Sequence, residues 1–244
     1  MNLLLLEPAD FEAPGRVSLQ GRRADHVRQV HRAVAGDRLR VGLIGGGMGE
    51  ALVAEVSPAQ VVLDVATADL ATPPPAKQPV ILLLALPRPK MLKRILQMVT
   101  TLGVEELVLL NSYRVEKSFW DSPWLAPEAV REQLVLGLEQ ARDTVLPRVT
   151  LAPRFKPFVE DVLPGLMAGR RGLLAHPGTG TACPADVRGP LLLAIGPEGG
   201  FIPYEVERLR EAGLEACDLG SRILRVETAV AVTLGRLLPP QVGA

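Results

Sequence analysis

The stretch Leu191–Phe201, LLLAIGPEGGF, decides the fold of this chain. A short apolar run, 191–195, stops at a glycine-rich loop, 196–200, and an amphipathic segment begins at Pro203, so the pattern predicts a buried strand, a tight loop and a helix. In an open α/β sheet, ligands bind just beyond the carboxyl ends of such strands. Glycines lack a Cβ and let a ligand approach the main chain closely. We therefore expect backbone N–H groups of this loop to bind a ligand, although a plain strand-to-helix connection fits the same pattern.

A second junction of the same kind lies at 216–229, ACDLGSRILRVETA. A strand is predicted to end near Leu219, where Gly220 follows, and a helix is predicted to begin at Glu227 and Thr228. An acidic residue or Thr is favoured in the first turn of a helix, because four N–H groups there lack partners and the helix dipole is positive. Glu227 and Thr228 therefore fit simple capping of this helix as well as a binding role.

A third junction precedes both, at 173–178, LLAHPG. Three loops at the ends of three strands can enclose one small ligand, which is where a binding site is expected. His176 has an unperturbed pKa that suits a general base. A His before Pro at a strand end also fits a structural role, and both interpretations stay open.

Length and composition limit the class of protein. The chain has 244 residues, 48% of them hydrophobic, and a formal net charge of zero, which suits one large or two small domains with real cores. The longest apolar runs are too short to cross a bilayer, and the amino terminus has no signal-peptide pattern. Cys183 and Cys217 lack the paired spacing of a zinc site or a disulfide scaffold. These features predict a cytoplasmic protein with no membrane partner and no metal.

The first part of the chain predicts short strands and one helix. The helix is expected at 24–34, with Val27, Val30 and Val34 at helical spacing on its apolar face. The run GLIGGGMG at 42–49 is followed by a strand and not by the helix of a dinucleotide-binding motif, so it predicts a hairpin. The predicted strands lie at 3–6, 17–19, 39–44, 50–56 and 60–66 and make a small barrel.

Arginines concentrate in the segment 16–40, which contains seven of them against two aspartates. Such a segment predicts a phosphate-binding face, and a solvated surface helix is the alternative. The candidate RNA-binding residues on this face are Arg22, Arg23, His26, Arg28 and Arg32.

A proline-rich linker at 72–79 is expected to be semi-rigid and to separate this part from the rest. Strands then alternate with helices, which implies α/β architecture with a mostly parallel sheet and helices on both faces. Strands are predicted at 80–86, 107–110, 149–152, 172–175 and 191–195, and helices at 91–102, 127–144 and 157–168.

Two motifs carry a resemblance to a known family. IGPEGGF at 195–201 and LGSRILRVETA at 219–229 resemble the paired signature of the small-subunit ribosomal RNA methyltransferase E family, which belongs to the SPOUT class. HVRQVHRAVAGD at 26–37 is similar to the family's segment in the same place. The segment 86–104 departs from the family pattern, because it lacks the usual Gly-Asp and has Thr101 where an acidic residue is common.

The resemblance implies a fold and an assembly. The fold class is α/β, with a PUA-like β-barrel RNA-binding domain at 1–72 and a SPOUT methyltransferase domain with a deep trefoil knot at 73–244. A homodimer is implied. The implied activity is S-adenosylmethionine-dependent methylation at N3 of one uridine in the decoding region of 16S rRNA, on the assembled 30S subunit. Transfer RNA or 23S rRNA as substrate, and a non-catalytic RNA-binding assembly factor, are the alternatives.

The chemistry of uracil suggests the catalytic residues. Uracil N3 is a poor nucleophile while it holds its proton, so a base, or a cation that stabilises the uridine anion, is required. Arginine fits the second role, and Arg225 and Arg142 are the candidates. Glu198 fits either an offset to the sulfonium charge or a carboxylate at a helix N-terminus. The cofactor-binding residues that the resemblance implies are Leu174, Ala175, His176, Pro177, Ile195, Gly196, Pro197, Glu198, Gly199, Gly200, Leu219, Gly220, Ile223, Leu224, Arg225 and Thr228.

Overall fold

The computed structural model describes residues 2–239 of the chain, apart from the side chain of Thr67, and divides them into two compact units. The first unit contains the described residues up to Ala76 together with Leu134–Leu146. The second contains Lys77–Gln133 and the described residues from Pro147 onward. The first boundary between them lies within the proline-rich segment 72–79, whereas the return of 134–146 to the first unit has no local signal in the sequence.

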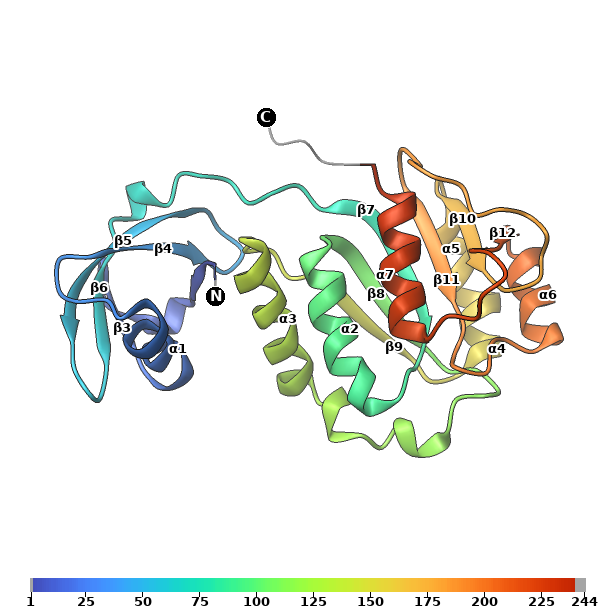
Figure 1. Cartoon of the computed structure of the whole chain (residues 1–244), viewed down its shortest axis with the longest axis horizontal. Coiled ribbons are helices and arrows are strands. Elements are labelled where there is room, and N and C mark those ends of the chain that lie inside the picture. Colours follow the sequence, from blue (N-terminus) through green and yellow to red (C-terminus); the bar gives the residue numbers. More distant parts are fainter. Residues whose placement is uncertain (1, 240–244) are drawn as a thin grey trace. The chain divides into compact units, whose positions relative to one another are not determined.

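The first unit is built on a six-stranded mixed sheet in the order β1-β4-β5-β6-β3-β2 (Figure 1). Only β1 and β4 pair in parallel, and the other neighbours are antiparallel. Inward-facing Val, Leu and Ala side chains of these strands form a buried core with residues of the adjoining helix. The strands are β1 (Leu4–Leu6), β2 (Phe11–Ala13), β3 (Arg16–Leu19), β4 (Arg38–Leu43), β5 (Met48–Val56) and β6 (Val61–Asp64).

The helix of this unit differs from the prediction. It consists of α1 (Gly21–His26) and a π-helical turn, η2 (Val27–His31), and it ends at Arg32, whose φ is 52°. The π turn holds an extra residue and so rotates the later side chains about the helix axis, and the left-handed residue then stops the helix. Val27 is buried as predicted, whereas Val30 and Val34 are 64% and 62% exposed, so the prediction of a helix to residue 34 with both valines in the core was wrong.

The predicted glycine hairpin is confirmed between β4 and β5. The short segment η3 (Thr67–Asp69) and the residues after it cross this hairpin at close range. A Cβ at Gly49 would lie 1.8 Å from the carbonyl oxygen of Asp69, and a Cβ at Gly47 would lie 2.0 Å from that of Leu70. These two glycines are therefore explained by close backbone packing and not by a bound nucleotide.

The second unit has a six-stranded sheet in the order β12-β10-β11-β7-β8-β9, in which every neighbouring pair is parallel. The central strands carry continuous apolar runs, buried throughout β11 and from Val80 onward in β7, as expected for a parallel sheet covered on both faces. The strands are β7 (Gln78–Ala85), β8 (Val104–Leu110), β9 (Arg148–Ala152), β10 (Arg171–Ala175), β11 (Leu191–Ile195) and β12 (Leu214–Cys217).

Helices cover both faces of this sheet, with α2 and α7 packed side by side on one face and the α4 to α5 segment on the other (Figure 1). Helix α3 starts in the second unit and ends in the first. The helices are α2 (Pro89–Thr101), α3 (Pro127–Ala141), α4 (Phe155–Pro157), α5 (Leu163–Met167), α6 (Pro203–Glu211) and α7 (Val226–Leu237), with η1 (Pro8–Asp10), η4 (Lys117–Phe119), η5 (Pro123–Leu125) and the π turn η6 (Phe158–Val162) between elements. Within residues 2–239, no helix combines the length and apolarity that a bilayer crossing needs.

Candidate functional site

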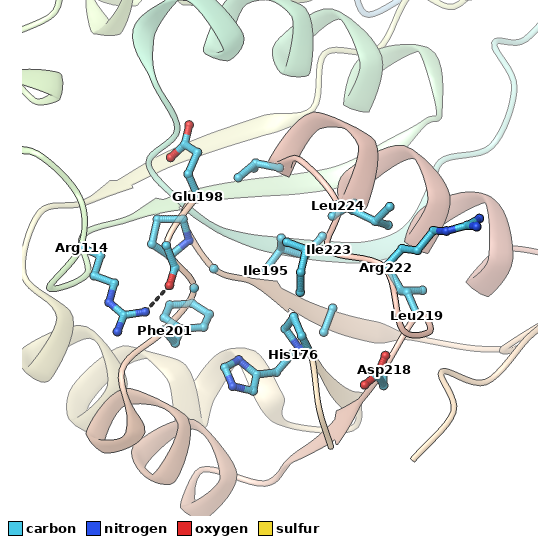
Figure 2. Close-up of a pocket in the computed structure, with 18 of the residues that line it drawn as sticks. Arg114, His176, Ile195, Glu198, Phe201, Asp218, Leu219, Arg222, Ile223 and Leu224 are labelled. Atoms are coloured by element: carbon cyan, nitrogen blue, oxygen red, sulfur yellow. Dashed lines mark hydrogen bonds between the residues drawn. The ribbon is translucent and has the colours of Figure 1, made fainter. Parts of the chain in front are cut away.

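The three predicted junctions meet at one cavity of about 330 Å³ at the carboxyl ends of β10, β11 and β12. Figure 2 shows Ile195, Ile223 and Leu224 together in this pocket, with Arg114 and Arg222 on opposite sides of it. The pocket therefore has an apolar centre, a main chain rich in glycine, and cationic groups at its edge. Its lining residues are Arg114, Ala175–Pro177, Ile195–Phe201, Asp218–Gly220, Arg222–Leu224, Val226 and Ala229.

The loop after β11 folds tightly against its own end. The N–H of Gly200 donates to the carbonyl oxygen of Pro197 at 2.7 Å, and Gly200 has a φ of 72°. A Cβ at Gly196 would lie 3.0 Å from the backbone nitrogen of Phe201, whose ring is buried. Glycine is thus needed here for a turn and for a close approach of the backbone.

Two neighbouring elements fix this loop. The Arg114 guanidinium, on the segment after β8, donates to the carbonyl oxygen of Gly199 (Figure 2). The backbone N–H of Arg88, at the start of α2, donates to Glu198 Oε1 at 3.3 Å. Of the two interpretations of Glu198, the structure therefore supports a carboxylate at a helix N-terminus.

Asp218 joins the loops that follow β10 and β12. Its carboxylate accepts from the N–H of Gly220 at 2.7 Å and from the N–H of Gly178 at 2.6 Å. These hydrogen bonds, with that of Gly220 the largest cause, lower the pKa of Asp218 below its usual value. The carboxylate is exposed and stays ionised, so it holds two walls of the pocket in register.

His176 lines the pocket from the end of β10, and its own N–H donates to the carbonyl oxygen of Cys217 at 2.9 Å. Burial lowers the pKa of the imidazole, the positive charge of Arg114 lowers it further, and Asp218 opposes both effects. These effects together favour the neutral form of the imidazole.

The structure brings the two cysteines together beside Asp218 at the end of β12, where both are buried and free. A hydrogen bond between them is the largest cause that lowers the pKa of Cys183 to about 7, and it raises the pKa of Cys217. The sequence did not predict this contact, which arises because Ala182 and Cys183 pair with Asp218 at the end of β12. Among the described residues there is no cluster of three or more His, Cys, Asp or Glu that could hold a metal ion.

Most predicted cofactor-binding residues line the cavity, whereas three of them, and the catalytic candidate Arg142, do not. Leu174 is buried within β10, Arg225 is the N-cap of α7, and Thr228 is exposed in the first turn of α7. Arg142 lies in the first unit and has a φ of 56°. Sequence reasoning missed Arg114, although the strand-end rule applied to β8 would have indicated it. It also left out Phe201, Asp218, Arg222, Val226 and Ala229, which lie within or next to the quoted motifs.

The predicted RNA-binding arginines are mostly engaged within the first unit. Arg22 pairs with the buried Glu139 at 2.8 Å, and Arg23 pairs with Asp10 at 2.6 Å. Arg28 bonds to Asp25 and to a backbone carbonyl. His26 stacks edge-on against His31, and burial lowers its pKa. Of the five candidates, Arg32 is the one cation for which the described residues provide no ion pair.

Comparison with known proteins defines the class of this site. The model of the RNA methyltransferase domain matches residues 74–238, which contain the whole pocket. The ribosomal RNA small subunit methyltransferase E of Treponema pallidum is 30% identical over 248 residues, covering 98% of this chain and 91% of that protein. The chain therefore belongs to the ribosomal RNA small subunit methyltransferase E family.

Solved structures agree with this assignment at the level of the fold. A methyltransferase from Legionella pneumophila, solved with its bound cofactor S-adenosylmethionine, aligns with a TM-score of 0.73 at 22% identity, covering 96% of each chain. The ribosomal RNA small subunit methyltransferase E of Neisseria gonorrhoeae, also bound to S-adenosylmethionine, aligns with a TM-score of 0.73 at 21% identity, covering 96% of this chain and 95% of that one.

Proposed function

We propose that the pocket binds S-adenosylmethionine and that the enzyme methylates N3 of one uridine in the decoding region of 16S rRNA. The observation that carries the proposal is the enclosure of one cavity by three glycine-containing loops of a chain that belongs to an rRNA methyltransferase family. Relatives of the same fold were crystallised with this cofactor bound. The volume of about 330 Å³ and the apolar centre suit a ligand of nucleoside size.

The chemistry of the pocket fits the cofactor. Main-chain amides of the loops at 196–200 and 219–224 offer donors to adenine and ribose, and Ile195, Ile223 and Leu224 offer apolar contact. S-adenosylmethionine supplies an electrophilic methyl group on a cationic sulfur. His176 and Pro177 form the wall after β10, and the carboxylate of Asp218 holds that wall against the loop after β12.

The cations near the pocket suit a uridine acceptor. Loss of the N3 proton leaves a delocalised anion, which a permanently charged guanidinium stabilises. Arg225 directly follows the lining residue Leu224, and Arg114 and Arg222 line the pocket themselves. We assign this role to Arg225 first, with Arg142 of the first unit as the other candidate, and we assign the positioning of the acceptor to the two lining arginines.

We also propose the assembly that the family resemblance implies. Support for a trefoil knot comes from the segment 176–187, which bonds both to the end of β12 and to the end of α7: Asp218 N–H donates to Thr181 O at 2.8 Å, and Val187 N–H donates to Leu237 O at 2.7 Å. Support for a homodimer comes from exposed apolar side chains at Ile223 and Val232. Light scattering tests the dimer, and a monomer that is active contradicts it.

The test of function uses 30S subunits and free 16S rRNA that lack the methyl group. Calorimetry is expected to give binding of S-adenosylmethionine, and nucleoside mass spectrometry is expected to give 3-methyluridine on the 30S subunit. Methylation of transfer RNA or 23S rRNA instead overturns the substrate, and absence of cofactor binding leaves a non-catalytic assembly factor.

A further inference from the structure

The segment that follows β8, residues 111–126, holds four of the eight Phe, Trp and Tyr residues of the second unit. It contains both tryptophans and one of the two tyrosines of the chain, together with a phenylalanine. We call these residues the aromatic segment. Trp120 is fixed by a hydrogen bond from its indole N–H to Asn111 Oδ1 at 3.0 Å, so the segment closes on itself next to the carboxyl end of β8.

Tyr113 stands out within the aromatic segment, because its side chain is 80% exposed. Its backbone is held firmly: the N–H of Tyr113 donates at 2.7 Å to Oε1 of Glu205, which is itself 2% exposed. The other oxygen of Glu205 accepts from the N–H of Ile202 at 3.0 Å, at the start of α6. A buried carboxylate thus anchors the main chain that presents a solvent-exposed aromatic ring.

Tyr113 directly precedes a residue that lines the pocket. The next residue, Arg114, lines the pocket and donates to the carbonyl oxygen of Gly199. The same loop receives the N-terminus of α2 through Glu198. The aromatic segment and the start of α2 therefore border the same loop of the pocket.

Helix α2 adds positive charge beside the aromatic segment. It contains Lys90, Lys93 and Arg94 near its N-terminus and no acidic residue. Cations are unfavourable at this end of a helix, where the dipole is positive. Lys93 Nζ lies 3.8 Å above the ring of Trp124, which joins the helix to the aromatic segment. Lys90 and Arg94 are exposed, and neither forms an ion pair with any part of the chain that the structure describes.

We propose that Tyr113 is the stacking platform for an unpaired base of the acceptor RNA at the rim of the pocket, and that Lys90 and Arg94 bind the phosphates beside it. This inference rests on the proposed function. An enzyme that modifies a base takes it out of its helix, and an exposed aromatic ring stacks on such a base with little sequence preference. Exposed cations without a carboxylate partner supply the salt-dependent attraction for phosphate. The paired arginines of the first unit, by contrast, have their charges offset by carboxylates.

The test of stacking compares three variants on 30S subunits. Tyr113→Ala is expected to raise KM for RNA about ten-fold, as loss of one stacked base does, while Tyr113→Trp retains most of the affinity. Tyr204→Ala is the matched control, because Tyr204 is the other tyrosine of the chain, is 46% exposed, and lies on α6 beneath Arg208. Cofactor affinity and thermal stability are expected to stay unchanged in all three variants. Equal KM values for Tyr113→Ala and Tyr204→Ala overturn the stacking role.

The test of the cations measures the salt dependence of RNA binding. Lys90→Ala/Arg94→Ala is expected to reduce the slope of log K against log salt by about two, one for each phosphate contact. Arg188→Ala/Arg210→Ala removes the same charge from exposed sites elsewhere in the second unit, and it is expected to leave the slope unchanged. Equal slopes for the two double variants overturn the phosphate role.

Different results would overturn the proposed function and the RNA-binding role of Tyr113, Lys90 and Arg94. A wild-type protein that binds no S-adenosylmethionine and methylates no RNA overturns the proposed function. A wild-type protein that methylates 30S subunits, with variants of Tyr113, Lys90 and Arg94 that match their controls, overturns only this inference.

Discussion

The guanidinium of Arg22 and the carboxylate of Glu139, 117 residues apart in the sequence, meet through two hydrogen bonds of 2.8 and 2.9 Å. Glu139 is 2% exposed, so its charge depends on this pair for compensation inside the first unit. A bidentate pair with one buried partner stabilises the fold more than a surface pair does, because its loss strands a buried carboxylate.

Arg22→Ala is therefore expected to lower the free energy of unfolding by about 2 kcal/mol, measured by urea denaturation. Arg38→Ala is the control, because its pair with Glu50, at 3.6 Å, is exposed on both sides and should contribute less than about 1 kcal/mol. Arg22→Met/Glu139→Leu, which removes both charges, should recover much of the loss. An Arg22→Ala variant as stable as Arg38→Ala would contradict a structural role and favour the RNA-binding role expected from the sequence.

The glycines of the loop after β11 should differ in their tolerance of a side chain. A Cβ at Gly196 meets backbone at 3.0 Å, whereas a Cβ at Gly199 lies 2.8 Å from Cδ of Arg114, a flexible side chain that can move. Gly196→Val is thus expected to weaken S-adenosylmethionine binding at least ten-fold by calorimetry, and Gly199→Ala to change it little. Unchanged affinity in Gly196→Val would refute the assignment of this pocket to the cofactor.

The pKa of His176 offers a test of the electrostatics of the pocket. Burial and Arg114 lower it, so its NMR titration midpoint should lie below the usual value of about 6.5. Arg114→Ala removes one cause and should raise the midpoint, while Asp218→Asn removes the opposing charge and should lower it. An unchanged midpoint in Arg114→Ala would show that the guanidinium does not act on the ring.

The same shift has a defined effect on stability. Because the pKa in the folded protein is below that in the unfolded chain, the folded state prefers the neutral ring. The contribution of His176 to the free energy of unfolding is complete above pH of about 6.5 and is lost as the pH falls through the folded-state pKa. A His176→Gln variant should therefore lose less stability than the wild type on acidification through this range.

The alternation of apolar runs and glycine-rich loops was sufficient to predict the parallel sheet and the three loops of the pocket. Local patterns carry such information, because strand ends and helix starts are set by neighbouring residues. The prediction from helical spacing was wrong for Val30 and Val34, because a π turn rotates the later side chains and a left-handed residue ends the helix before Val34. The pairing of Arg22 with Glu139, and the return of Leu134–Leu146 to the first unit, depend on tertiary packing that no local pattern encodes.

The sequence likewise predicted only part of the lining of the pocket. Residues inside the two motifs were found, whereas Arg114 was missed because it comes from a fourth strand end without glycines. The contact between Cys183 and Cys217 was not predicted, since 34 positions separate their sequence numbers and the pairing of the loop after β10 with the end of β12 brings them together.

That thiol pair supports a final prediction. The hydrogen bond with Cys217 is the largest cause that lowers the pKa of Cys183 to about 7. Cys217→Ala removes this bond, so thiolate formation at Cys183, followed by its ultraviolet absorbance, should move from near pH 7 toward the usual thiol value of about 8.5. Cys217→Ser keeps a hydroxyl donor and should retain more of the lowering of the Cys183 pKa.

The same lowered pKa makes stability depend on pH. Because the folded-state pKa of Cys183 is depressed, its contribution to the free energy of unfolding is present above pH of about 8.5 and is lost as the pH falls through about 7. Cys217→Ala should flatten this dependence of stability on pH. A titration identical to that of the wild type would mean that the neighbouring charges of Arg236 and Arg171, and not the second thiol, set the acidity of Cys183.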